Sequence, residues 1–150
     1  SAFKKAGSWE VKQNLITVRA AAEALSALDP HHATLDLLPY VDRIIALARG
    51  QRDLTARVSA MVALGNWEFD KALKPARVVL ADASAPRDLR AAAARAIGLI
   101  LRGKAETDEE TFGILLAALG SDDPVISGAT GRALASAPLT AEQRSRIPEK

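Results

Sequence analysis

The chain is 150 residues long; 49% of its residues are hydrophobic but only 4% are aromatic, and 20 basic and 18 acidic residues leave a formal net charge of +2. Cysteine is absent, which excludes disulfide frameworks, thiolate metal sites and thiol nucleophiles. The nearly balanced charge is weak evidence for a nucleic-acid partner. An apolar content made mostly of Ala, Leu, Val and Ile favours closely packed helices over a sheet sandwich.

Charged residues interrupt every apolar stretch before it reaches the ~18 to 20 residues that cross a bilayer. Asp42 and Arg43 do so within 37–48. The N-terminus has no signal-peptide pattern, and the sequence begins with Ser1 instead of Met, which suggests a segment of a longer chain. We expect a soluble protein without a membrane span, located in the cytoplasm, with the periplasm left open as an alternative.

Apolar residues recur at spacings of three and four along the chain, separated by short clusters of Gly, Pro, Asp and Ser. This pattern is typical of helices joined by turns. In chain order, the predicted helices span 9–28, 34–49, 53–65, 67–83, 86–102, 108–119, 124–136 and 141–146.

Residues at the predicted helix ends support these limits. Three glycines follow helices where a left-handed C-cap is expected; they are Gly50, Gly103 and Gly120. Two threonines have capping-box spacing to a residue three positions on; the pairs are Thr107 with Glu110 and Thr140 with Gln143. Two prolines are expected in first helical turns; they are Pro86 and Pro124.

Four nine-residue segments align without gaps, and their starts are 39, 33 and 37 residues apart. The segments are 18–26, 57–65, 90–98 and 127–135. In all four, the fourth position is small, the seventh is Ala and the eighth is aliphatic. Spacings of three and four place these residues on one helical face, where small side chains let neighbouring helices approach closely. A period in this range, with two helices per unit, predicts an α-solenoid.

Segments 57–65 and 90–98 resemble the second helix of HEAT repeats of the bacterial phycobilisome-lyase type, which follows the pattern Arg-x-x-Ala-x-x-Ala-Leu-Gly. The first helix of a HEAT repeat often carries a proline, as 38–41 (Leu-Pro-Tyr-Val) and 74–77 (Lys-Pro-Ala-Arg) do. Such a proline is expected to bend its helix. The third unit departs from the pattern, because Phe112-Gly113 stands in place of the proline and Ser127 in place of the arginine.

The resemblance implies one all-α domain over 1–150, an α-solenoid of about three to four antiparallel helical hairpins. Helical pairs are expected at about 33–66, 67–103 and 107–137. An inner helix at 9–28 lacks its partner, and a short closing helix is expected at 140–146.

Arginines divide into two groups by their place on the helical wheel. Arg57 and Arg90 lie at the edge of the buried face, where HEAT repeats form Asp–Arg ladders, and the expected partners are Asp53 and Asp88. Arg95 and Arg102 point away from the core. The first pair therefore has a predicted structural role.

Arg95, Arg132, Arg102 and Trp67 are the candidate partner-binding residues. An outward arginine on an inner helix can bind carboxylates or phosphates in a bidentate manner. Arg95 and Arg132 share the sixth segment position with Glu23 and Val62, which argues against a continuous phosphate-binding stripe. A solvated face is the alternative for the arginines.

Trp9 and Trp67 stand at predicted helix starts, where packing over a helix junction is the alternative to anchoring a partner. HEAT-like DNA glycosylases place aromatic and acidic residues around a damaged base, and Trp67 with Glu68 and Asp70 is similar in residue type only.

Nothing in the sequence predicts a catalytic residue, a metal or a cofactor. His31 and His32 lie in a predicted turn, where adjacent side chains need not converge on one ion. The acidic run at 106–110 coincides with a predicted helix start, where negative charge is favoured.

The leading hypothesis is therefore a non-enzymatic scaffold that binds a protein or peptide. A nucleic-acid-binding or base-repair protein and an accessory subunit of a chromophore lyase are the alternatives.

Overall fold

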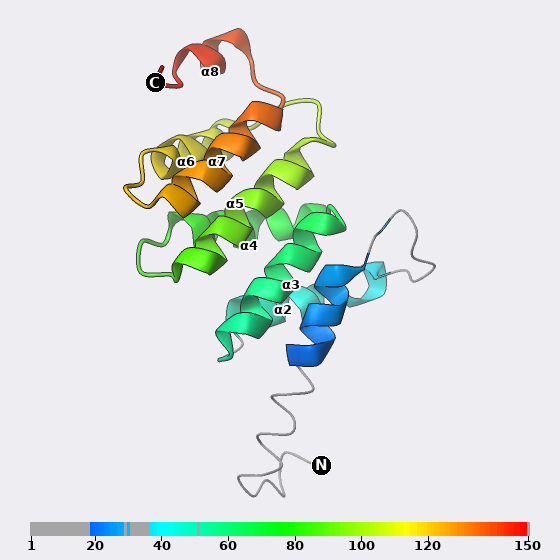
Figure 1. Ribbon diagram of the computed structural model, residues 1–150. Helices are drawn as coiled ribbons and strands as arrows, with labels where there is room; N and C mark the ends of the chain where they lie inside the picture. The colour runs from blue at the N-terminus through cyan, green and yellow to red at the C-terminus, as the bar shows by residue number, and fades with distance from the viewer. Residues whose placement is uncertain (1–18, 29, 31–36, 51, 150) are drawn as a thin grey trace, which may run out of the picture.

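The computed structural model describes residues 19–28, 30, 37–50 and 52–149, and every regular element within these ranges is a helix (Figure 1). Residues 19–27 are helical. Trp9, His31, His32 and the first half of the predicted helix 9–28 lie outside the described residues. Among the helices of the described ranges, none is long and apolar enough to cross a membrane.

The other elements follow in chain order: η1 (Leu38–Tyr40), α2 (Val41–Gly50), α3 (Leu54–Asn66), η2 (Asp70–Ala72), α4 (Leu73–Ala81), α5 (Arg87–Leu101), α6 (Glu109–Leu119), α7 (Pro124–Ser136) and α8 (Ala141–Ser145). These bounds match the predicted helices within a few residues, with two exceptions. Residues 38–40 of the predicted helix 34–49 form η1, so α2 begins only at Val41. The predicted helix 67–83 begins later, because residues 67–69 form a turn and η2 precedes α4.

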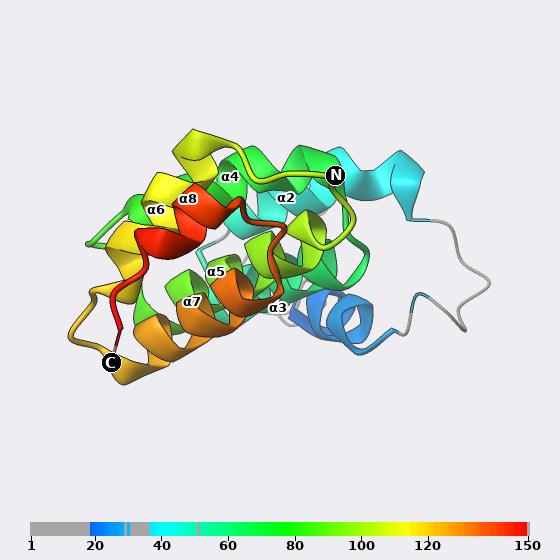
Figure 2. The same cartoon turned by 90° about the horizontal axis from the view of Figure 1, so that it is seen from above.

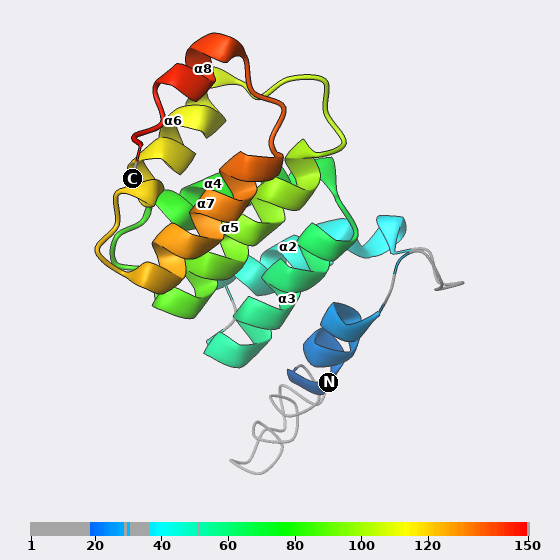
Figure 3. The ribbon, with the colours of Figure 1, turned by 45° about the horizontal axis from the view of Figure 1, so that its top comes forward.

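The helices pack in two layers. In the first, which we call the alanine layer, α3 packs against α5 and α5 against α7. Figure 3 shows helix 19–27 beside α3, so that it forms one edge of this layer and α7 forms the other. The second layer contains α2, α4 and α6, each packed against the next helix along the chain (Figure 2). Consecutive helices therefore alternate between the layers.

Glycine brings the helices of the alanine layer into backbone contact. A Cβ atom added at Gly65 would lie 2.8 Å from Cα of Ala96, and one added at Gly98 would lie 2.9 Å from both Cα and Cβ of Ala133. Both contacts join the ninth position of one segment to the seventh position of the next. Because a real Cβ atom essentially never comes so close, any side chain at these glycines would push the helices apart.

The predicted glycine caps are wrong. None of the glycines in the described part of the chain has a positive φ, so the helices end without left-handed residues. After α5, the N–H of Gly103 instead donates to the carbonyl of Ile100, and after α6 the N–H of Gly120 donates to that of Ala117. These four-residue turns, in which the N–H of one residue donates to the carbonyl three positions earlier, satisfy carbonyls that a left-handed cap would otherwise satisfy.

The predicted starts of α6 and α8 have different outcomes. The capping box of Thr140 and Gln143 is confirmed. The box predicted for Thr107 is wrong, because Asp108 is the N-cap of α6 and accepts from the backbone N–H of Thr111. A carboxylate one residue closer to the helix satisfies that N–H and favours the positive end of the helix dipole.

The prolines occupy helix starts. Pro124 is the first residue of α7, as predicted, and Pro86 is the N-cap of α5. Pro39 lies in η1 and Pro75 is the third residue of α4, so neither bends a helix from its interior. In the first turn a proline lacks only an N–H that would have no partner within the helix.

Candidate binding surface

Arg95 and Arg132 lie on neighbouring helices of the alanine layer. Both side chains are exposed, and neither has a hydrogen bond or an ion pair within the described residues. Of the other members of their column, Val62 on α3 is half-buried and Glu23 is exposed. The structure therefore brings the two arginines onto one layer without an acidic partner.

Arg102 and Trp67, the other two candidates, instead join α3 to α5. The guanidinium of Arg102 lies 3.5 Å from Oε1 of Glu68. Trp67 is the C-cap of α3, not the start of a helix; it packs against the core and its ring stacks on Phe69 with centroids 6.4 Å apart. Its indole Nε1 is buried and has no hydrogen-bond partner among the residues that the structure describes. Packing over a helix junction is thus the role seen for Trp67.

Acidic residues near Trp67 are engaged in ion pairs. Asp70 lies 3.2 Å from Nζ of Lys104, and Glu68, which has a positive φ of 54°, is the partner of Arg102. Glu68 and Asp70 line a cavity of about 360 Å³ together with apolar residues such as Ile100. The arrangement binds the turn after α3 to the turn after α5.

Arg57 and Arg90 do not form the predicted ladder. Nε of Arg57 donates to the carbonyl of Ala48 at 3.2 Å, and Nε and NH2 of Arg90 donate to the carbonyl of Leu80 at 3.1 and 3.0 Å. These carbonyls lie in the last turns of α2 and α4, where a positive charge is favoured. Each arginine therefore has a structural role, but inside its own helical pair and not between units.

A ladder between units exists and uses other residues. Arg19 binds Asp53 through two bonds of 2.7 and 2.6 Å, and Arg87 binds Asp123 at 2.5 Å. Asp53 and Asp123 are the N-caps of α3 and α7. The hydrogen bond from Arg19 lowers the pKa of Asp53, and that from Arg87 lowers the pKa of Asp123. At the equivalent position of α5 stands Pro86, whose side chain offers no acceptor.

A groove runs along the free face of α7, and we call it the α7 groove. It has a volume of about 1050 Å³. Its floor is Gly128, Gly131 and Ala135, which share one face of α7. Apolar walls come from α6 and from the segment after α8; they include Leu116, Leu119, Ile147 and Pro148. Sequence reasoning missed this groove, although small residues at the second, fifth and ninth positions of the fourth segment were its signal.

Charge around the α7 groove is mainly positive. Arg132, Arg144 and Arg146 line it, with Glu149 as the one acidic residue among its lining. Arg146 is engaged with Glu109 at 2.9 Å, whereas Arg132 and Arg144 are exposed without a partner in the part of the chain that the structure describes.

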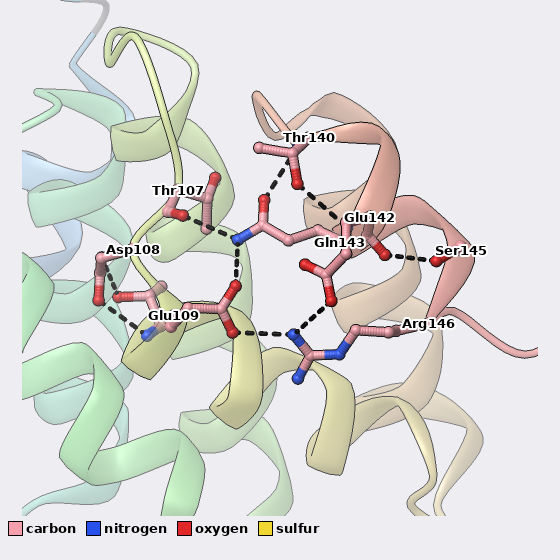
Figure 4. A network of polar contacts seen from close by, with 9 residues as sticks. Thr107, Asp108, Glu109, Thr140, Glu142, Gln143, Ser145 and Arg146 are labelled. Carbon is pink, nitrogen blue, oxygen red and sulfur yellow. Dashed lines mark hydrogen bonds and ion pairs between the residues drawn. The ribbon is translucent and has the colours of Figure 1, made fainter.

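Polar contacts hold α8 against the start of α6 and so fix one wall of the α7 groove (Figure 4). The buried amide of Gln143 donates to the carbonyl of Thr107 at 3.0 Å and to Oε1 of Glu109 at 3.1 Å. The guanidinium of Arg146 also lies 4.9 Å from the ring centroid of Phe112. Hydrogen bonds from Arg146 and Gln143 lower the pKa of Glu109.

The acidic run at the start of α6 has a capping role. Asp108 is the N-cap, and Glu109 and Glu110 lie in the first turn. Over the described residues, no group of three or more His, Cys, Asp or Glu side chains is placed to hold a metal ion.

Comparison with known proteins gives no match. No protein-family model fits the chain, and neither a curated protein nor a solved structure is significantly similar to it. The resemblance to HEAT repeats therefore rests on the residues of the repeated segments alone.

Proposed function

We propose that this chain is part of a HEAT-type α-solenoid that serves as a non-enzymatic scaffold for protein–protein interaction. The support for the solenoid is recurrence. The Gly65–Ala96 contact between α3 and α5 is repeated by the Gly98–Ala133 contact between α5 and α7. Each of these helices also packs against the helix that precedes it in the chain, which gives a series of similar units.

The observation that carries the binding role is a pair of exposed arginines on adjacent helices, neither of which has a partner within the described part of the chain. Arg95 and Arg132 project from the alanine layer while most other basic side chains near them, such as Arg87 and Arg102, are engaged in ion pairs. An arginine fork recognises a carboxylate with two parallel hydrogen bonds. The partner that fits best is a protein segment carrying acidic side chains.

Affinity capture tests this proposal. The chain, immobilised, should retain a defined protein from extract of its source cells, and Arg95→Ala with Arg132→Ala should reduce the retained amount. The matched control is Arg43→Ala with Arg49→Ala, which removes the same charge from exposed positions of α2 in the second layer. Equal loss in both double variants would reject the two arginines as the binding residues.

Nucleic acid is the alternative occupant of the same arginines, since phosphates also accept two hydrogen bonds. Binding to phosphates weakens steeply with salt because counterions are released. If labelled DNA or RNA binds with such a salt dependence and the Arg95→Ala, Arg132→Ala variant loses it, the protein-scaffold proposal gives way to a nucleic-acid-binding function.

A further inference from the structure

Over the described residues, the alanine layer has α7 at one edge and helix 19–27 at the other, and the two edges differ in shape and charge. At one edge, α7 presents the groove floored by Gly128, Gly131 and Ala135. At the other edge lies helix 19–27 (Figure 3). Its exposed residues Ala20, Ala24 and Ala27 are spaced so that they share one face.

We propose that copies of this chain associate head to tail, with helix 19–27 of one copy seated in the α7 groove of another. This inference rests on the stacking of repeated units proposed above. The occupant is argued from the register of that stacking and from charge.

The register comes from the two internal contacts of the alanine layer. In both, the ninth position of one segment meets an alanine at the seventh position of the next, as Gly98 meets Ala133. At the free edges the same two positions are Ala135 on α7 and Ala24 on helix 19–27, and both are exposed. A second copy can therefore repeat the internal contact with residues of the same small size.

Charge favours the same pairing. The exposed Glu23 lies one residue from Ala24, on the edge that has to enter the groove. The groove that receives it is lined by Arg132 and Arg144, whose exposed side chains have no partner in the described ranges. Opposite charges at the rim of an interface select partner and orientation.

Such a contact joins two different surfaces, so each copy keeps one free groove and one free helix after pairing. Sedimentation equilibrium of the full chain should therefore give an average mass that rises with concentration and passes the dimer value. A constant monomer mass up to millimolar concentration would overturn the inference.

Ala135→Arg places a long charged side chain on the floor of the groove, and it should weaken association at least about tenfold because close packing tolerates no insertion. The matched control is Ala117→Arg, the same change at an exposed alanine of α6 outside the groove. The control should associate like the parent chain. If the two variants behave alike, the groove is not the contact.

Charge reversal gives a second, independent test. Glu23→Arg and Arg132→Glu should each weaken self-association by about fivefold, the scale of one exposed ion pair. An equimolar mixture of the two variants should associate again, because every groove then meets a helix of opposite charge. Arg95→Glu makes the same charge change outside the groove and should have no effect. A mixture that stays as weak as its components would overturn the proposed orientation.

These results separate the inference from the proposed function. A monomeric chain that still captures a partner through Arg95 and Arg132 loses only the head-to-tail contact. Association that survives while no partner is captured leaves the contact in place and removes the scaffold role.

Discussion

The alanine layer and the second layer both have ion pairs between helices, and the alanine layer adds backbone contacts at glycines. In the alanine layer, Gly65 and Gly98 bring backbones into contact with Ala96 and Ala133. In the second layer, charged side chains bridge neighbouring elements: Asp42 lies near Lys71, Arg77 near Asp108, and Glu109 near Arg146. The first kind of contact fixes the distance between helices, whereas the second tolerates small displacement because long side chains can adjust.

The largest effect is expected from crowding the alanine layer. Ala96→Leu adds volume at a fully buried residue in contact with Gly65, and overpacking there should lower the free energy of unfolding by about 1 to 3 kcal/mol. Urea denaturation measures the loss. Arg95→Ala, one residue away on the exposed side of α5, should be close to neutral. Similar losses for both would show that the faces of α5 are assigned wrongly.

In the second layer, the largest single loss should come from Gln143→Ala. The change removes the capping-box partner of Thr140 and leaves the carbonyl of Thr107 without its donor, which should cost about 1 to 2 kcal/mol. Hydrogen exchange should rise over 141–146 and stay unchanged in α3 and α5. Thr140→Ala removes the capping hydroxyl but leaves the amide of Gln143 to donate to Thr107, so it separates the two contributions.

Two glycine-to-alanine variants separate the effect of helix–helix contact on stability from the effect of helix propensity. Alanine in a helix interior is favoured over glycine by about 1 kcal/mol, so Gly113→Ala, with nothing within 4 Å of the added Cβ, should raise stability by up to about that amount. Gly98→Ala should instead lower stability by about 1 kcal/mol, because the clash with Ala133 exceeds the gain in propensity. Thermal unfolding of both variants gives the two signs. A stabilising Gly98→Ala would mean that the helices can move apart at little cost.

The smallest effect concerns the ladder between units. Since Arg87 lowers the pKa of Asp123 in the folded state, the pair stabilises the fold above the ordinary carboxyl pKa, and this contribution is lost as pH falls through the lowered value. Asp123→Asn should reduce the melting temperature slightly at neutral pH, and the difference from the parent chain should shrink below about pH 4. Asp122→Asn, an exposed neighbour without an ion pair in the described region, should show no such convergence.

Helix positions could be predicted from the sequence because apolar spacing and turn residues are local signals. The capping box of Thr140 and Gln143 depends on residues three apart, and it was correct. The predicted partners of Arg57 and Arg90 were wrong. The true partners depend on how far one helix is shifted along its neighbour, and residue spacing within a helix does not encode that shift. Both arginines reach carbonyls at the end of the preceding helix, Ala48 and Leu80.

The α7 groove could not be predicted either, because it also depends on contacts between distant parts of the chain. Gly128, Gly131 and Ala135 are visible as small residues in the fourth segment, but a groove also needs walls, and Ile147 and Pro148 come to it from beyond α8. That placement depends on the contacts of Gln143 and Arg146 with α6, between residues more than thirty positions apart. Arg95 and Arg132 were placed on the exposed face because helical periodicity alone decides which way they point.

Pro86 has a mechanical consequence. The starts of α5 and α7 are joined by the ion pair of Arg87 with Asp123. Between α3 and α5, a proline stands at that place. These two helices are joined beyond their ends instead, by the ion pairs of Glu68 with Arg102 and of Asp70 with Lys104. Under tension, the contact between α3 and α5 and the contact between α5 and α7 are expected to open from opposite ends.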